Sequence, residues 1–198
     1  MIDPSGWDLP SLTDRWRSAT PFGHVAIDDL VARAALDELR QGVSKEPHWP
    51  NRGEIFEMMA SGPPQQPTPR AFLEALGGPA VRDALAAITG YRLQRVDGNS
   101  YVYLAGSYLL PHTDHRPGVD RRIAYVYYLS PEGAFTGGEL DLYRCTTDGS
   151  GDIVATEIAA TLAPRPNRLL LFDVGLTTLH QVREVTGGAR ISLAGWFY

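Results

Sequence analysis

The chain has 198 residues, of which 43% are apolar and 21% charged, and a formal net charge of −5, values that suit a single globular domain with a sizeable core. It contains no Lys/Arg-rich block, so we expect neither nucleic acid nor an anionic membrane as a partner. Its one cysteine, Cys145, excludes an intrachain disulfide and thiolate-rich metal sites. Without a signal-peptide pattern or a long apolar run, the sequence predicts a soluble cytoplasmic protein with no membrane span.

The first ninety residues are predicted to form helices and loops, and they carry no chemical motif. We expect residues 1–25 to be irregular, because three prolines interrupt them. A helix is expected to begin at Asp28 or Asp29, since either side chain can cap a helix. An apolar stripe continues it to Gly42, which is a residue suited to ending a helix.

Residues 43–68 are rich in Pro, Gly and Gln. This composition predicts a long loop, with one helical turn near 55–59. A second helix is expected to begin at Thr68-Pro69 and end at Leu76, and a third to run from Pro79 to Ile88. Glycines follow both of these helices and favour their termination.

From Tyr91 the chain changes to short β-branched and aromatic runs separated by turns. Closely spaced strands without helices between them favour an antiparallel sandwich or barrel, with the helices on one outer face. We therefore expect a mainly β fold with N-terminal helices, built as one domain (1–198) in which a support region (1–90) carries a catalytic core (91–198). The expected strands are 91–96, 100–105, 107–111, 121–129, 138–143, 153–162, 167–173, 178–182 and 189–197.

Three residues of this region are candidate metal ligands: His112, Asp114 and His180. The first two lie at i and i+2, so an extended segment points both side chains the same way. Two imidazoles and one carboxylate can occupy one face of a six-coordinate metal and leave three positions open, as in non-haem Fe(II) oxygenases. An isolated His-x-Asp pair is common by chance, and a lone buried histidine is more often a hydrogen-bonded core residue. The metal interpretation is favoured because the pair, the later histidine, Arg190 ten residues beyond it and the β context agree.

The other histidines suit a metal site less well. His115 has the wrong parity to face the same way as His112, so we expect it to be a loop residue. His24 and His48 lie outside the expected strands.

The segment Tyr103-Leu-Ala-Gly-Ser-Tyr-Leu-Leu-Pro-His-Thr-Asp114 resembles the iron(II)- and 2-oxoglutarate-dependent dioxygenases, and is most similar to their prolyl 4-hydroxylase-like branch. The resemblance covers about residues 91–198. It implies a double-stranded β-helix (jelly-roll) core with iron at one mouth. Further matches are Val126-Tyr-Tyr-Leu129, Gly137-Gly-Glu-Leu140, Arg168-Leu-Leu-Leu-Phe172, His180 and Arg190-Ile-Ser-Leu-Ala-Gly-Trp196.

The resemblance implies that His112, Asp114 and His180 are the catalytic iron ligands. It also implies that Arg190 pairs with the distal carboxylate of 2-oxoglutarate, since a guanidinium can bind a carboxylate through two hydrogen bonds. The alternative for Arg190 is a surface salt bridge. Three hydroxyl groups are further candidates for contact with the co-substrate, although aromatic residues also favour strands for packing alone. They belong to Ser192, Tyr103 and Tyr128.

The implied activity is hydroxylation of an unactivated C–H, or a related oxidation such as desaturation, with conversion of 2-oxoglutarate and O2 to succinate and CO2. Ascorbate is a candidate reductant. The substrate is expected to be an amino acid, a peptidyl residue such as proline, or a small metabolite. Leu109 stands where many prolyl hydroxylases carry a tyrosine, so a prolyl substrate does not follow from the motif. Three arginines could bind an acidic group of the substrate, or they could form a solvated charge cluster: Arg116, Arg121 and Arg122.

Two other functions fit a β-barrel with these residues. One is a non-catalytic metal-binding or sensing module, which would normally have lost a ligand or the anion-binding arginine. The other is a cupin-like dioxygenase that does not use 2-oxoglutarate, against which Arg190 and Ser192 argue. The oligomeric state is left open.

Overall fold

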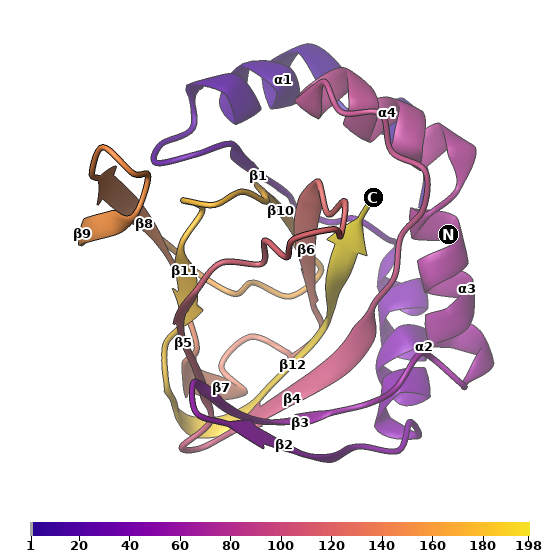
Figure 1. Cartoon of the computed structure of the whole chain (residues 1–198). Coiled ribbons are helices and arrows are strands. Elements are labelled where there is room, and N and C mark those ends of the chain that lie inside the picture. The colour runs from indigo at the N-terminus through magenta and orange to yellow at the C-terminus, as the bar shows by residue number, and fades with distance from the viewer. Residues whose placement is uncertain (1) are drawn as a thin grey trace.

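The computed structural model describes residues 2–198. In this part of the chain, strands form one antiparallel sheet that curls round on itself, and helices lie along one outer face (Figure 1). The helical segments are η1 (Pro4–Gly6), α1 (Leu9–Ser18), α2 (Arg33–Ser44), α3 (Pro67–Leu76) and α4 (Pro79–Thr89). The strands are β1 (His24–Ile27), β2 (Trp49–Gly53), β3 (Phe56–Ala60), β4 (Asn99–Leu104), β5 (Tyr108–His112), β6 (Ile123–Tyr128), β7 (Phe135–Gly137), β8 (Leu140–Thr147), β9 (Ile153–Leu162), β10 (Leu169–Asp173), β11 (His180–Val182) and β12 (Val185–Phe197).

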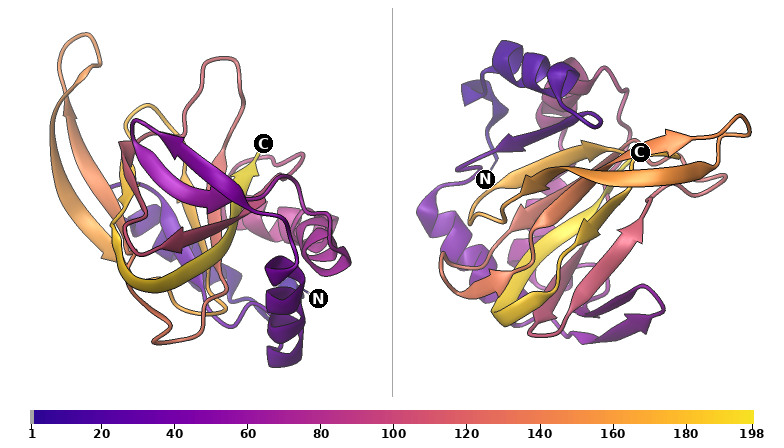
Figure 2. Two further views of the ribbon diagram at one scale, coloured as in Figure 1. Left: turned by 90° about the horizontal axis from the view of Figure 1, so that it is seen from below. Right: turned by 90° about the vertical axis from the view of Figure 1, so that its left-hand side faces the viewer.

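The strand order is β1-β10-β6-β12-β4-β3-β5-β11-β8-β9, with β2 paired to β3 and β7 paired to β12. Most strands that are neighbours in the sheet are therefore not consecutive in the sequence, as in a jelly roll. This arrangement confirms the expected jelly-roll core buttressed by helices. Figure 2 shows the β8–β9 hairpin projecting beyond the rest of the sheet, where β9 forms one edge.

The buried strands β6 and β10 divide the core into two layers because successive side chains point to opposite faces. One face packs against the helices, where Phe72 of α3 stacks on Tyr127 of β6 with ring centroids 4.7 Å apart. The opposite face points into the curl of the sheet and carries Ala124, Val126 and Tyr128. The helices thus cover the outside of the sheet, as expected, and leave its inner face to the site.

The N-terminal expectations were partly wrong. Residues 1–25 are not irregular over their described part, while Met1 lies outside the described residues. Helix α1 begins after Asp8, whose side chain accepts a hydrogen bond from the Ser11 backbone N–H. Pro10 lies in its first turn, where a missing N–H breaks no helical bond. His24 opens β1, contrary to the expectation that it lies outside the strands.

Helix α2 begins at Arg33, later than expected, and neither Asp28 nor Asp29 caps it. Asp29 instead has a positive φ of 52°. Gly42 does not end the helix but lies buried within it. A Cβ atom at this position would lie 2.7 Å from the Cδ atom of Pro69. The glycine therefore permits the close approach of α2 to α3.

The segment 43–68 is not a long loop with a helical turn. Most of it forms the β2–β3 hairpin, and β3 pairs both with β4, at Met59↔Val102, and with β5, at Phe56↔Leu109. The hairpin has Pro50 and Gly53 in β2 and no regular apolar alternation, so tertiary pairing overrides a weak local preference.

The remaining expectations for helices and strands were close. Helix α4 begins at Pro79 as expected and ends before Gly90, which has a φ of 80°. Helix α3 begins at Pro67, slightly before the expected start at Thr68-Pro69. All expected strands except 91–96 are present, and that segment forms only a single bridge at Val96. The short strand β7 was missed.

Within residues 2–198, none of the helices has the length and apolar character needed to cross a membrane.

Candidate active site

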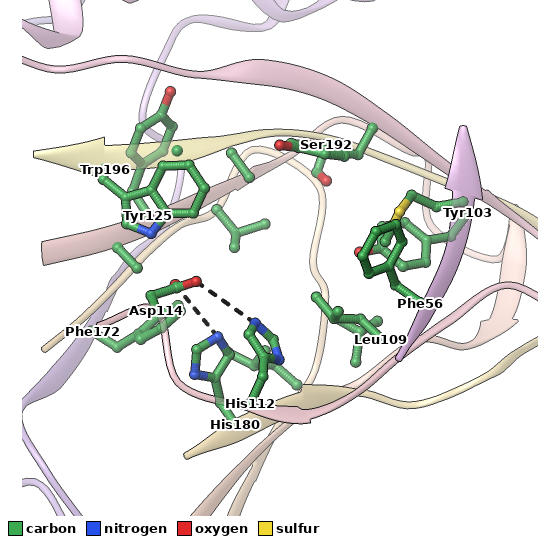
Figure 3. Close-up of a pocket in the computed structure, with 18 of the residues that line it drawn as sticks. Phe56, Tyr103, Leu109, His112, Asp114, Tyr125, Phe172, His180, Ser192 and Trp196 are labelled. Atoms are coloured by element: carbon green, nitrogen blue, oxygen red, sulfur yellow. Dashed lines mark ion pairs between the residues drawn. The ribbon is translucent and has the colours of Figure 1, made fainter. Parts of the chain in front are cut away.

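His112 and His180 lie opposite each other on neighbouring strands. His112 ends β5 and pairs in register with His180, the first residue of β11, and their ring centroids are 4.3 Å apart. The Asp114 carboxylate oxygens lie 3.7 Å from Nε2 of His112 and 3.5 Å from Nε2 of His180 (Figure 3). One potential ligand atom from each residue lies within 4.8 Å of the others. The curl of the sheet therefore brings the three predicted residues together around a space that one ion can fill.

Backbone carbonyls fix the orientation of both imidazoles. Nδ1 of His112 lies 2.9 Å from the Leu110 carbonyl oxygen, and Nδ1 of His180 lies 3.0 Å from that of Thr178. A carbonyl only accepts hydrogen bonds, so in the neutral ring each Nδ1 carries the proton and donates it. The lone pair of each Nε2 is then directed at the shared space, as a metal-binding histidine requires.

The electrostatics of the site keep His180 and Asp114 in their metal-binding protonation states. Burial, aided by the charge of His112, lowers the pKa of His180 to about 4, although Asp114 opposes this shift. Burial alone would raise the pKa of Asp114. The nearby His112 and His180 side chains outweigh this effect, so the pKa of Asp114 falls to about 2. At neutral pH the carboxylate is ionised and His180 is neutral.

Arg190 is a buried cation inside the curled sheet. Its side chain is 1% exposed, and it forms no ion pair with any residue from 2 to 198. Its Nε atom is buried without a hydrogen-bond partner. The guanidinium lies over the rings of Tyr103 and Tyr128, 4.9 and 5.0 Å from their centroids. A surface salt bridge is therefore excluded for Arg190. Because an unneutralised buried charge is costly, the arrangement favours an anionic ligand here.

Hydroxyl groups surround this guanidinium. Ser192 is buried two residues along β12, on the same face as Arg190. The Tyr128 hydroxyl is buried and has no hydrogen-bond partner in the described chain. Burial raises the pKa of Tyr103, so its hydroxyl stays protonated and able to donate. The structure thus gathers all four predicted co-substrate residues in one place.

A cavity of about 370 Å³ connects the metal triad with Arg190 and Ser192. Residues of the β2–β3 hairpin and of the segment 113–121 contribute to its lining. Sequence reasoning missed several lining residues. Tyr101 shares a strand face with Tyr103, so strand parity was an available signal for it. The β2–β3 hairpin, within the segment 43–68, also lines the cavity through Asn51, Ile55, Phe56 and Met58.

The remaining predicted residues lie in different surroundings. His115 is exposed and lies outside the cavity lining, and His48 is hydrogen bonded to Ser100. Of the three clustered arginines, Arg116 and Arg121 line the cavity. Arg122 forms an ion pair with Asp120 instead.

Comparison with known proteins shows the family to which the chain belongs. The chain is 31% identical over 189 residues to the prolyl 3-hydroxylase OGFOD1 of Xenopus laevis, a match that covers 91% of this chain and 35% of the relative. It is 36% identical over 128 residues to the prolyl 3-hydroxylase sudestada1 of Drosophila melanogaster, covering 60% and 23% respectively. The chain therefore spans only about a quarter to a third of the length of these relatives.

Solved structures share the fold. A prolyl-4-hydroxylase of Pseudomonas putida superposes with a TM-score of 0.70 at 21% identity, covering 96% of this chain and 97% of the other. A prolyl hydroxylase of Trichoplax adhaerens, in complex with a peptide fragment of the hypoxia inducible factor oxygen degradation domain, gives a TM-score of 0.70 at 15% identity, with coverage of 96% and 90%. The sequence profile of the 2OG-Fe(II) oxygenase superfamily matches residues 98–198, which contain the triad and Arg190. The chain therefore belongs to the 2OG-Fe(II) oxygenase superfamily.

Proposed function

We propose that this chain is an Fe(II)- and 2-oxoglutarate-dependent hydroxylase that acts on a prolyl residue of a peptide. The observation that carries the proposal is that His112, Asp114 and His180 converge in the same cavity as the buried, unpaired Arg190. A metal site alone would suit many functions. A metal site beside a buried guanidinium suits an enzyme whose co-substrate is an anion that also binds the metal.

The residues fit both groups that the family uses. His112 and His180 each present an Nε2 lone pair, and Asp114 supplies an ionised oxygen, so these three would hold Fe(II). Arg190 would bind the distal carboxylate of 2-oxoglutarate, with Ser192, Tyr103 and Tyr128 as neighbouring hydroxyl donors. The buried Nε of Arg190 and the buried hydroxyl of Tyr128 would both gain hydrogen-bond partners.

When bound, iron and 2-oxoglutarate supply the oxidising power that converts O2 and 2-oxoglutarate to succinate, CO2 and a hydroxylated product. The protein positions and insulates these groups. Phe172 packs edge-on against His180, with ring and imidazole centroids 4.6 Å apart, and so excludes water from one side of the triad. The three residues would hold the metal from one side, which would leave room for the co-substrate and O2.

A peptidyl prolyl substrate is supported by the relatives. The curated relatives are prolyl 3-hydroxylases, and one structural neighbour was solved with a peptide bound. Leu109 lines the cavity where many prolyl hydroxylases have a tyrosine. Tyr101 also lines it and has not been assigned to the co-substrate.

The proposed unit is the whole chain, with residues 1–90 supporting a catalytic core at 91–198. The pairing of β3 with both β4 and β5 supports treating the two regions as one unit, because residues of the N-terminal region then form part of the cavity wall.

The test is an incubation of the protein with Fe(II), 2-oxoglutarate, ascorbate and proline-containing peptides. We expect succinate to form only with 2-oxoglutarate present, and the peptide to gain one oxygen atom by mass spectrometry. Amino-acid analysis then separates 3- from 4-hydroxyproline. The matched control is His180→Ala. Turnover with free proline or another small molecule but with none of the peptides would refute the substrate, and no succinate under any condition would refute the activity.

A further inference from the structure

Trp196 lines the cavity together with the metal triad, and its side chain has been given no role so far. It is six residues after Arg190 on β12, so its side chain faces the same cavity. Figure 3 shows its indole nitrogen turned toward the carboxylate of Asp114. Its Nε1 atom is buried and has no hydrogen-bond partner in residues 2–198.

A buried N–H without a partner is unfavourable, so this donor favours a nearby acceptor. The Asp114 carboxylate has two oxygens, and a three-ligand face needs only one of them. The second oxygen would then need a hydrogen-bond donor, since an ionised carboxylate only accepts hydrogen bonds. The indole N–H and this second oxygen therefore complement each other.

Arg121 fixes the indole in place. Its guanidinium carbon lies 3.5 Å from the centroid of the Trp196 ring, a cation–π contact. The same guanidinium donates a hydrogen bond to the backbone carbonyl of Asp114, 3.1 Å away. On the other side, the backbone N–H of Trp196 donates to the Asp97 carboxylate at 3.2 Å. Arg121 thus contacts both Asp114 and the ring that faces it.

We propose that Trp196 is a positioning residue for the metal: its indole N–H holds one oxygen of Asp114, so that the carboxylate binds iron through the other oxygen alone. Arg121 maintains this arrangement by stacking on the indole. A carboxylate that bound through both oxygens would occupy one of the positions needed for the co-substrate and O2. The inference rests on the proposed metal centre, but not on the identity of the substrate.

Trp196→Phe tests the inference because it keeps an aromatic face for Arg121 and removes only the N–H donor and part of the ring. The measurement is calorimetric binding of Mn(II), which occupies such a site without turnover. Partners that orient metal ligands typically contribute 10- to 100-fold to metal affinity. We therefore expect the variant to bind Mn(II) at least roughly 10-fold more weakly than the wild type. Trp49→Phe is the control, because Trp49 is 54% exposed and lies outside the cavity lining, and it should bind with wild-type affinity.

Wild-type affinity in Trp196→Phe would overturn the inference. Thermal unfolding of the metal-free proteins shows whether this variant is intact. If it is not, Arg121→Met provides the second test, since loss of the stacking contact should also weaken Mn(II) binding, and unchanged binding would overturn the inference. If the wild type itself does not bind Mn(II), the metal centre is wrong and the inference falls with it. If Mn(II) binds but no peptide is hydroxylated, only the proposed substrate or activity fails, and the comparison of variants still decides the role of Trp196.

Discussion

Arg190 gives a test in which co-substrate affinity and stability should move in opposite directions. Arg190→Met keeps a long side chain but removes the charge. Loss of a charge-assisted hydrogen-bonded pair weakens binding by about 2–3 kcal/mol, which raises the Kd for 2-oxoglutarate roughly 30- to 150-fold. The same change removes a 1% exposed cation that has no ion-pair partner in the described structure. Replacing buried charges by apolar side chains of similar size often stabilises a protein, by about 1–4 kcal/mol. The ligand-free variant should therefore be more stable than the wild type.

The assay is thermal unfolding in the presence of Mn(II), with and without 2-oxoglutarate at about 100 times the wild-type Kd. At that concentration the ligand stabilises the wild type by about 2.7 kcal/mol. For a chain of this length, this corresponds to a rise in Tm of roughly 5–11 °C. If the Kd of the variant is about 100-fold higher, the same concentration stabilises it by only about 0.4 kcal/mol, or roughly 1–2 °C.

Two results would refute this reasoning. If 2-oxoglutarate raises the Tm of Arg190→Met as much as that of the wild type, Arg190 does not bind the co-substrate. If ligand-free Arg190→Met unfolds at a lower temperature than the wild type, the guanidinium stabilises the ligand-free fold. It would then not be an uncompensated charge that awaits an anion. Arg92→Met, at an exposed arginine, is the matched control and should leave both quantities unchanged.

Other changes test the site and its supports. His180→Ala should abolish Fe(II) binding in a metal titration, whereas His115→Ala should bind with wild-type affinity; equal losses would contradict the ligand assignment. Asp141, fully buried on β8, accepts hydrogen bonds from Gln181 of β11, from Arg183 just after that strand and from Thr161 of β9. Asp141→Ala should lower the free energy of unfolding in urea by about 2–3 kcal/mol, and a loss below about 0.5 kcal/mol would show that these bonds matter little. Hydrogen bonds from Arg168 hold the pKa of Asp28 below its ordinary value of 3.8. A lowered carboxyl pKa stabilises the fold above the unfolded-state pKa, and this contribution is lost as the pH falls through the folded-state pKa. Asp28→Asn should therefore be less sensitive than the wild type to acid below about pH 4, and identical acid unfolding curves would contradict this ion-pair contribution.

Spacing and strand parity identified most of the candidate site. His112 and Asp114 at i and i+2 face the same way on an extended segment, and Arg190 and Ser192 do so on β12, because strand geometry alone dictates it. These relations need no knowledge of the fold. The same rule extends to Tyr101, which could have been found by continuing the face of β4 on which Tyr103 lies.

The failures share a physical cause. The β2–β3 hairpin has little strand propensity of its own and depends on pairing with β4 and β5, so a local pattern favoured a loop. Likewise, the prolines before residue 25 suggested irregular structure, although Pro10 lies in a helical turn that tolerates it. Asp28 looked like a helix cap but forms an ion pair with Arg168, 140 residues away.

By itself, the sequence determined the chemical groups present, the face of each strand on which they lie and the change from helices to strands near Tyr91. These features depend on local periodicity and on side-chain chemistry. The tertiary structure decided which of these groups meet. Only the curl of the sheet brings His180 against His112, and only burial leaves Arg190 without a counter-ion. Such long-range contacts arise from burying one face of the sheet under the helices and closing the other around the cavity, and no short window of sequence encodes that closure.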